Sequence, residues 1–226
     1  MGNGIIKILK FMWDCVLQVV YDGDEKCILC EKELYNCNYI CADCEKRIKF
    51  CNDPFDIKFN NIKITSYSVS YYSGAMMELI LKLKYKSNFR AGETIANYMI
   101  DLVKREKLKF DFIAYIPMNK SAMKKRGYNQ SRYLARIVSD SLNIPIIDCL
   151  KKIHQTEDQI GLNHDERWEN MRECFKFIDK INIKNKRILI IDDVVTTGAT
   201  TFYCAYELIK NGAEEITVLT GAKSKV

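Results

Sequence analysis

Hydrophobic and polar positions follow two periods along this chain, that of an amphipathic helix and that of a half-buried strand. The helical period predicts helices at residues 75–84, 89–107, 131–142 and 202–210. Short runs rich in branched and aromatic residues predict a strand or hairpin at 62–72 and strands at 112–116, 144–147, 187–191 and 215–219. Strands that alternate with helices indicate a parallel sheet covered by helices, so the predicted fold class is α/β.

The end of the expected strand 187–191 carries the most specific chemistry in the chain. Asp192 and Asp193 follow it directly, and the loop Thr196-Thr197-Gly198-Ala199-Thr200 leads from there into the next expected helix. Backbone N–H groups at a helix start favour a phosphate, and Gly198 permits a tight turn. Carboxylates repel a phosphate, but they accept hydrogen bonds from sugar hydroxyls. A phosphate site beside a diol site predicts a ribose 5-phosphate ligand.

The alternative for this segment is an ordinary buried strand followed by a polar loop. Paired acids beside an apolar strand cost stability unless they are used, which favours the ligand site. The nucleoside-triphosphate loop Gly-x-x-x-x-Gly-Lys-Ser/Thr does not occur anywhere in the sequence.

A second candidate region follows the expected strand 112–116. The loop Pro117-Met118-Asn119-Lys120 lies at the carboxyl end of that strand, where open α/β sheets bind ligands. Arg126, a short distance on, has the planar fork that suits a phosphate. The alternative is a basic loop without a ligand that begins the next helix, with Asn129 or Ser131 as its cap.

Six of the ten cysteines fall between Cys27 and Cys51. Two Cys-x-x-Cys pairs at this separation can close a tetrahedral zinc site, and too few apolar residues lie here for a separate core. Disulfides are the alternative, but no secretory signal is visible and a reducing compartment is expected. Cys37 and Cys51 are spare, and either could replace an outer ligand. The predicted zinc ligands are Cys27, Cys30, Cys41 and Cys44.

The length of 226 residues, with 48% hydrophobic residues, suits one good core and a small appendage. Residues 5–20 have an apolar helical face, but the run is too short and too interrupted by charge to span a membrane. Packing on the body or on a partner is the expected role of this segment. The formal net charge of +6 is moderate, and its local basic groups are mostly expected to be solvated surface.

The segment from Asp192 to Thr200 resembles the signature of the type I phosphoribosyltransferases, whose loop holds the ribose 5-phosphate part of phosphoribosyl pyrophosphate (PRPP). A closer resemblance, to the ComF family, covers the chain from about Cys27 to its C-terminus. Tyr128 stands where the family usually has Phe, a change that keeps the ring. The resemblance rests on the cysteine pairs, the Pro117 loop, Arg126-Gly127-Tyr128-Asn129-Gln130, the spaced Gln159, Leu162, Arg167, Asn170 and Phe175, and Asp192-Asp193-Val194-Val195-Thr196-Thr197-Gly198-Ala199-Thr200.

The predicted organisation is an N-terminal helix and a four-cysteine zinc-finger module at residues 1–55, followed by a phosphoribosyltransferase-like domain at 56–226. The resemblance implies a cytoplasmic protein of natural transformation, possible association with the inner face of the membrane, a helicase-like partner, and Mg²⁺ that arrives with PRPP. Asp192 and Asp193 would hold the ribose hydroxyls and face the cation that develops on the sugar. The implied PRPP-binding residues are Asp192, Asp193, Thr196, Thr197, Gly198, Ala199, Thr200, Met118, Asn119, Lys120 and Arg126.

Two functions remain open at this point. The first is a phosphoribosyltransferase, whose acceptor no residue set in the chain identifies. The second is a non-enzymatic accessory protein of DNA uptake that binds single-stranded DNA and a helicase-like partner. The paired acids favour a sugar ligand, because a protein that only bound DNA would gain nothing from those charges.

Overall fold

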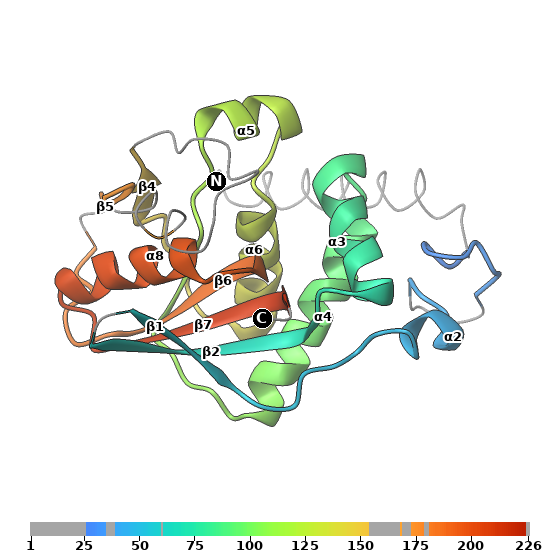
Figure 1. Ribbon diagram of the computed structural model, residues 1–226, viewed down its shortest axis with the longest axis horizontal. Helices are drawn as coiled ribbons and strands as arrows, with labels where there is room; N and C mark the ends of the chain where they lie inside the picture. The colour runs from blue at the N-terminus through green and yellow to red at the C-terminus, as the bar shows by residue number, and fades with distance from the viewer. Residues whose placement is uncertain are drawn as a thin grey trace, which may run out of the picture.

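A five-stranded sheet is the framework of the computed structural model, which describes residues 26–34, 39–59, 61–153, 168, 173–178 and 181–224 (Figure 1). The strand order is β1-β2-β7-β6-β3. β2, β7, β6 and β3 run parallel, and β1 is an antiparallel edge strand. These strands are β1 Phe55–Phe59, β2 Ile62–Tyr71, β3 Phe112–Tyr115, β6 Arg187–Val195 and β7 Glu215–Lys223. The expected α/β fold with a mostly parallel sheet is confirmed.

Helices cover both faces of the sheet (Figure 1). α3, α4 and α6 pack on one face, while α8 and a small antiparallel ribbon of β4 and β5 pack on the other. The helices are α2 Ala42–Glu45, α3 Gly74–Lys86, α4 Phe89–Arg105, α5 Lys120–Arg126, α6 Gln130–Leu142 and α8 Ala199–Lys210, and the ribbon strands are β4 Leu150–Lys152 and β5 Phe175–Phe177.

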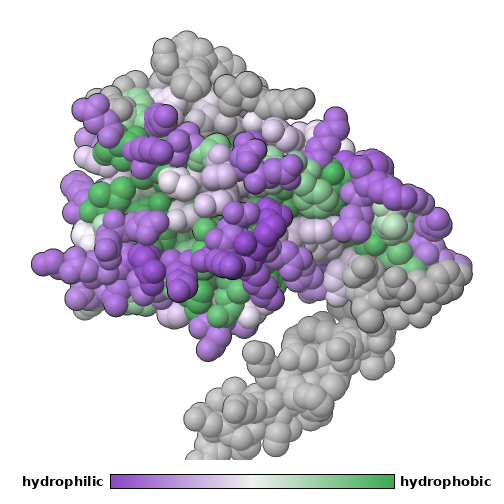
Figure 2. Space-filling model, turned by 90° about the horizontal axis from the view of Figure 1, so that it is seen from below, coloured by the Kyte–Doolittle hydropathy of each residue, from purple (hydrophilic) through white to green (hydrophobic). Residues whose placement is uncertain are grey.

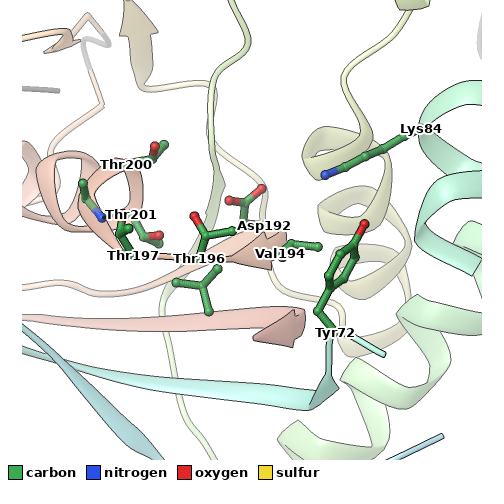
Figure 3. A pocket seen from close by; sticks show the side chains of 11 residues that line it. Tyr72, Lys84, Asp192, Val194, Thr196, Thr197, Thr200 and Thr201 are labelled. Atoms are coloured by element: carbon green, nitrogen blue, oxygen red, sulfur yellow. Dashed lines mark hydrogen bonds between the residues drawn. The ribbon is translucent and has the colours of Figure 1, made fainter. Parts of the chain in front are cut away.

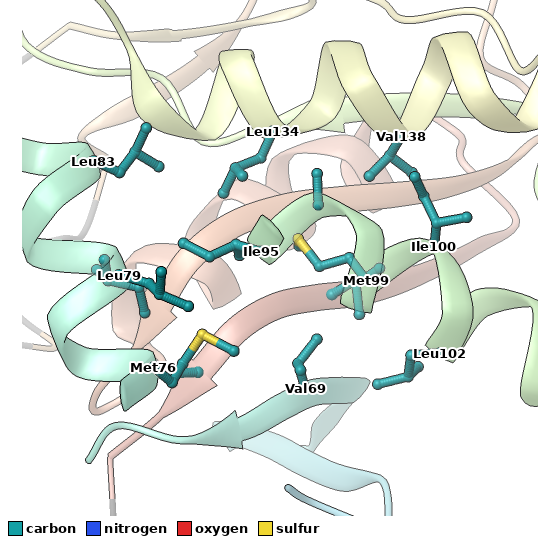
Figure 4. Packing of buried hydrophobic residues seen from close by; sticks show 14 of the residues in the cluster. Val69, Met76, Leu79, Leu83, Ile95, Met99, Ile100, Leu102, Leu134 and Val138 are labelled. Carbon is teal, nitrogen blue, oxygen red and sulfur yellow. The ribbon is translucent and has the colours of Figure 1, made fainter. Parts of the chain in front are cut away.

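The central strand β6 contributes side chains to two separate hydrophobic cores. Its successive side chains point to opposite faces, so Leu189 and Ile191 join the cluster under α3, α4 and α6, where Figure 4 shows Ile95, Met99 and Leu134 interdigitating. The alternate positions Ile188 and Ile190 join the cluster under α8. A strand buried on both faces reads as a continuous apolar run, which is the pattern that the sequence shows at 187–191.

Most expected elements are present with small shifts at their ends. Strands 62–72, 112–116 and 215–219 correspond to β2, β3 and β7, and the four expected helices to α3, α4, α6 and α8. The expectation that strand 187–191 ends before the acids was wrong, because β6 continues to Val195 by pairing Asp192 with Thr220 and Val194 with Ala222 of β7. The expected strand 144–147 is reduced to one parallel bridge between Ile146 and Ile113.

Three kinds of element were not expected. β1 forms a hairpin with β2, the β4–β5 ribbon has only three residues per strand, and α5 occupies part of the segment that was expected to be a loop. Segments this short carry too few periods for a hydrophobic pattern to identify them.

Several sequence predictions lie outside the described residues. They include the helix at 5–20, Cys37, and the spaced residues Gln159, Leu162, Arg167 and Asn170. Within the described part of the chain, no helix is long and apolar enough to cross a membrane. On the face shown in Figure 2, hydrophilic side chains are interspersed with small hydrophobic patches.

Close packing of α4 against its neighbours generates a first prediction. A Cβ at Gly92 would lie 2.5 Å from Cε1 of Tyr133 on α6 and 2.9 Å from Cδ1 of Leu83 on α3. Gly92→Ala should therefore lower the free energy of unfolding by about 1–3 kcal/mol, because overpacking outweighs the better helix propensity of alanine. Denaturant titration would measure it. Asn97→Ala, on the exposed side of the same helix, should stay within about 0.5 kcal/mol of the wild type. A Gly92→Ala variant at least as stable as the wild type would contradict this packing.

Candidate functional site

Asp192 presents a carboxylate near the carboxyl end of β6. Its Oδ1 accepts a hydrogen bond from Ser131 Oγ at 2.7 Å and another from the backbone N–H of Asp193 at 2.9 Å. Burial and the neighbouring charge of Asp193 raise the pKa of Asp192 to about 7, although Ser131 and Lys84 act in the opposite direction. Asp192 therefore holds its proton to a higher pH than a carboxyl group in water does.

Asp193, the next residue, is neutralised from within the protein. Its Oδ2 lies 3.0 Å from Nζ of Lys84, and the two side chains are 5% and 19% exposed. Burial opposes the charge of Lys84, but the carboxylates of Asp193 and Asp192 outweigh that effect, and the pKa of Lys84 is raised. Lys84 thus remains a cation beside the two acids at neutral pH.

The loop after β6 has the geometry of an anion site. Gly198 adopts a positive φ of 84° as the N-cap of α8, and a Cβ there would lie 2.8 Å from Cγ2 of Ile57. Only glycine meets both conditions without strain. Thr197 Oγ1 accepts a hydrogen bond from the N–H of Ala199 at 3.4 Å. The first turn of a twelve-residue helix follows, so its N–H groups and partial positive charge face the same place.

A pocket of about 280 Å³ joins the acid and the loop (Figure 3). In Figure 3 the Lys84 side chain extends toward Asp192 from one side, while Tyr72 lies below it and Thr196 stands on the opposite side. The remaining lining residues come from β6, the loop and the first turn of α8. The lining residues are Tyr72, Lys84, Asp192, Val194, Val195, Thr196, Thr197, Gly198, Ala199, Thr200 and Thr201.

The pocket brings together six of the expected ligand residues and leaves five elsewhere. Asp192 and the five residues from Thr196 to Thr200 line it, whereas Asp193 is adjacent and paired with Lys84. Met118, Asn119, Lys120 and Arg126 are not among the lining residues.

Asn119 and Arg126 have structural partners on and near α5. Asn119 caps α5 by accepting a hydrogen bond from the N–H of Ala122 at 2.7 Å, and the Arg126 guanidinium lies 5.2 Å from the ring centre of Tyr85. Lys120 is exposed at the start of this helix.

The Arg-Gly-Tyr-Asn-Gln run organises the entry into α6. Asn129 accepts a hydrogen bond from the N–H of Arg132 at 3.1 Å, which confirms it as the cap, and donates one to the carbonyl of Ile116 at 3.0 Å. Gly127 ends α5 with a positive φ of 79°. These contacts place Ser131 where it reaches Asp192, so the run supports the acid site from the side of α6.

Sequence reasoning missed Lys84 and Tyr72 as lining residues. Lys84 lies four residues after Ile80, and therefore on the same face of α3 as that buried residue. This position was a signal that the lysine side chain could point toward the interior. Tyr72 comes directly after β2, at the same edge of the sheet as the acids. Without the order of strands, neither residue could be assigned to this edge.

The four predicted zinc ligands lie together. The sulfur atoms of Cys27, Cys30, Cys41 and Cys44 are all within 4.8 Å of one another, and Sγ of Cys30 is 3.6 Å from Sγ of Cys41. Thiolates around tetrahedral zinc at about 2.3 Å are roughly 3.8 Å apart, so the set fits such an ion. The cluster could hold a metal such as zinc.

The other described cysteines lie outside the four-cysteine cluster. Cys51 is buried outside the cluster, and none of the eight cysteines of the described residues is in a disulfide. Within the cluster, burial opposes ionisation of Cys27, but the backbone N–H groups of Cys41, Cys30 and Leu29 prevail and lower its pKa to about 6, whereas burial and the neighbouring thiols raise the pKa of Cys44. A thiolate at neutral pH is the form that binds a metal.

The cysteine module is attached to the sheet domain through α3 and α4. Cys27 and Cys44 belong to the same buried cluster as Met76 of α3. Arg47 pairs with Glu78 of α3, and Tyr98 of α4 donates a hydrogen bond to Glu45 at 2.7 Å. The module therefore shares its core with the larger domain.

Metal content tests the cysteine site. Freshly purified protein should hold about one zinc per chain, and Cys41→Ser should lose it and destabilise the module, because the ion supplies folding energy there. Metal analysis and thermal unfolding would show both effects. Cys51→Ser, a change at a buried cysteine outside the cluster, should keep the zinc. A stable protein without metal would contradict the assignment.

Comparisons with known proteins agree with this architecture. The family model of the phosphoribosyl transferase domain matches residues 129–223. Competence protein F of Haemophilus influenzae is 27% identical over 216 residues, which cover 85% of this chain and 94% of that protein. Competence protein ComFC of Streptococcus pneumoniae is 24% identical, with 90% and 83% covered. DNA utilization protein YhgH of Salmonella typhi is 26% identical, with 67% and 68% covered. These similarities support the assignment of the chain to the ComF family, with a phosphoribosyltransferase-like domain.

Proposed function

We propose that the pocket binds the ribose 5-phosphate part of PRPP or of a related ligand. The observation that carries the proposal is the pairing of an anion-binding helix start with the Asp192 carboxylate in one pocket. The matched phosphoribosyl transferase domain includes both parts. A volume of about 280 Å³ lies at the lower end of ligand pockets and suits a small polar group.

In this proposal each part of the ligand meets a group of matching chemistry. The 5-phosphate lies on the backbone N–H groups and hydroxyls of residues 196–200, and Asp192 accepts hydrogen bonds from the ribose hydroxyls. Lys120 and Arg126, with Met118 and Asn119 of the preceding loop, attend the pyrophosphate. Mg²⁺ arrives with the pyrophosphate, since it prefers substrate phosphates to an all-protein cage.

Phosphoribosyl transfer, the reaction of this class of protein, needs no covalent bond between the protein and the substrate. The bond between the anomeric carbon and pyrophosphate breaks, and its electron pair leaves with the pyrophosphate. A lone pair of the acceptor forms the new bond to that carbon, and the acceptor loses a proton. Asp192 would face the positive charge that develops on the sugar, and the pocket would orient the ring and limit access of water.

The biological setting that we propose is the uptake and use of DNA. The relatives are named as competence and DNA utilization proteins. Such a protein would act in the cytoplasm, in part at the inner face of the membrane, beside a helicase-like partner. The cysteine module, which α3 and α4 hold on one side of the domain, is the surface that we propose for that partner.

A second candidate function, binding of single-stranded DNA, is favoured by an aromatic and basic surface near α3 and α5. Tyr85 is 64% exposed and Phe89 is 45% exposed. Arg126 stacks on Tyr85, and Lys124 and Lys125 are exposed beside it on α5. Aromatic rings that stack on bases and cations that meet phosphates are the usual elements of such a surface.

Calorimetric titration of PRPP with Mg²⁺ tests the first proposal. The wild type should bind saturably, and Asp192→Asn should weaken binding at pH 8 by about tenfold or more, because the charged acceptor of the sugar hydroxyls is lost. Asp140→Asn, at an exposed acid on α6, should bind as the wild type does. Absence of binding by folded wild-type protein would contradict the proposal.

A salt titration tests the second candidate. Binding of a labelled oligothymidylate should weaken steeply between 50 and 200 mM salt, by about 300-fold for six contacts, because the cations of the protein release counterions from the strand. Tyr85→Ala should weaken binding by about 1–3 kcal/mol, whereas Tyr206→Ala, at an exposed tyrosine of α8, should not. Fluorescence anisotropy measures both, and binding that ignores salt would overturn the candidate.

A further inference from the structure

Lys84 brings a cation into the pocket from a helix outside the matched domain. The family model covers residues 129–223, while Lys84 lies near the C-terminal end of α3. Its Nζ is 3.0 Å from Oδ2 of Asp193, and its side chain is 19% exposed. Among the residues that line the pocket in the described part of the chain, Lys84 alone carries a positive charge.

Two adjacent carboxylates in a buried strand cannot both stay ionised without help. Each raises the cost of ionising the other, and burial adds to that cost. The cation of Lys84, in contact with Asp193, offsets part of this cost, and its field also favours the charged form of Asp192, although burial and the charge of Asp193 act more strongly in the opposite direction. The two acids thereby take different roles: Asp193 is held by Lys84, and Asp192 stays open to the pocket.

We propose that Lys84 is a positioning residue of this site: it holds Asp193 in an internal ion pair and favours the ionised form of Asp192, which accepts hydrogen bonds from ligand hydroxyls. The effect on ligand affinity rests on the proposed function, whereas the effect on the charge of Asp192 is a property of the ligand-free protein.

Charged and polar groups from four elements bear on Asp192. Asp193 of β6 opposes its ionisation, while Lys84 of α3 and the hydroxyl of Ser131 of α6 favour it. Cys204 of α8 remains a neutral thiol, because burial holds its pKa well above the ordinary value. Arg126, at the end of α5, acts on Lys84 by opposing its charge. Removing Lys84 therefore leaves Ser131 and the N–H of Asp193 as the groups that favour the Asp192 carboxylate.

The direct test is the titration of Asp192 by carboxyl ¹³C NMR in the ligand-free protein. Lys84→Met should raise the midpoint from about 7 by about one pH unit, because a favourable neighbouring charge is gone. Lys86→Met removes the same charge from an exposed position on the same helix and should leave the midpoint unchanged. An unshifted Asp192 in Lys84→Met overturns the proposal.

Ligand affinity gives a second measurement. At pH 7 Lys84→Met should bind PRPP with Mg²⁺ about fivefold more weakly than Lys86→Met, because a smaller fraction of Asp192 is ionised, and should regain affinity as the pH rises. A weakening that does not depend on pH would overturn the role through Asp192. If wild-type protein does not bind PRPP but the Asp192 midpoint still shifts in Lys84→Met, the result contradicts PRPP as the ligand and supports the role of Lys84.

A further pair of variants covers the case in which Lys84→Met does not fold because Asp193 is left buried without a partner. Asp193→Asn and Asp193→Asn/Lys84→Met compare Asp192 with and without the lysine, and the double variant has no unpaired acid at position 193. The Asp192 midpoint should be higher in the double variant than in Asp193→Asn. Equal midpoints would overturn the proposal.

Discussion

The arrangement around β6 depends on one electrostatic constraint, two consecutive carboxylates in the central strand, of which Asp193 is buried and Asp192 is half-buried at the pocket. A carboxylate removed from water needs a counter-charge or several hydrogen bonds. Lys84 supplies the first for Asp193, and Ser131 supplies part of the second for Asp192. Because these groups come from α3 and α6, both helices must reach the carboxyl edge of the sheet. The contact between Asn129 and the carbonyl of Ile116 fixes the start of α6 at the end of β3 accordingly.

α3 connects this site to the cysteine module. Near its start, Glu78 pairs with Arg47 of the module, and Met76 is buried in the same cluster as Cys44. Near its end, Lys84 meets Asp193. The module has too few apolar residues for a separate core, so it must use the larger domain, and it does so through the helix that also carries the cation of the pocket. A change at either end of α3 acts on a helix that both sites share.

Much of this architecture could be predicted from local pattern, and what escaped prediction has a physical reason. The apolar run before Asp192, the glycine turn at Gly198 and the two Cys-x-x-Cys pairs encode their geometry within a few residues. Lys84 reaches the site only through the order of the strands and the packing of α3, which no local pattern contains. The end of β6 was misplaced for a similar reason: pairing with β7 carries the strand through two polar residues that a hydrophobic pattern treats as its end.

The geometry of a β-strand explains why the two adjacent acids have different surroundings. Successive residues of a strand point to opposite faces, so neighbouring aspartates cannot serve one ligand in the same way. In this protein Asp192 lines the pocket and Asp193 turns to the lysine of α3. The two acids therefore have different roles: the carboxylate of Asp192 faces the pocket, and the carboxylate of Asp193 binds the cation of Lys84 beside it. Such an arrangement places a negative and a positive charge within one small pocket, next to a helix start that favours a phosphate. That combination suits a ligand that carries hydroxyls and phosphate together, and it is poorly matched to a ligand with only one of these groups.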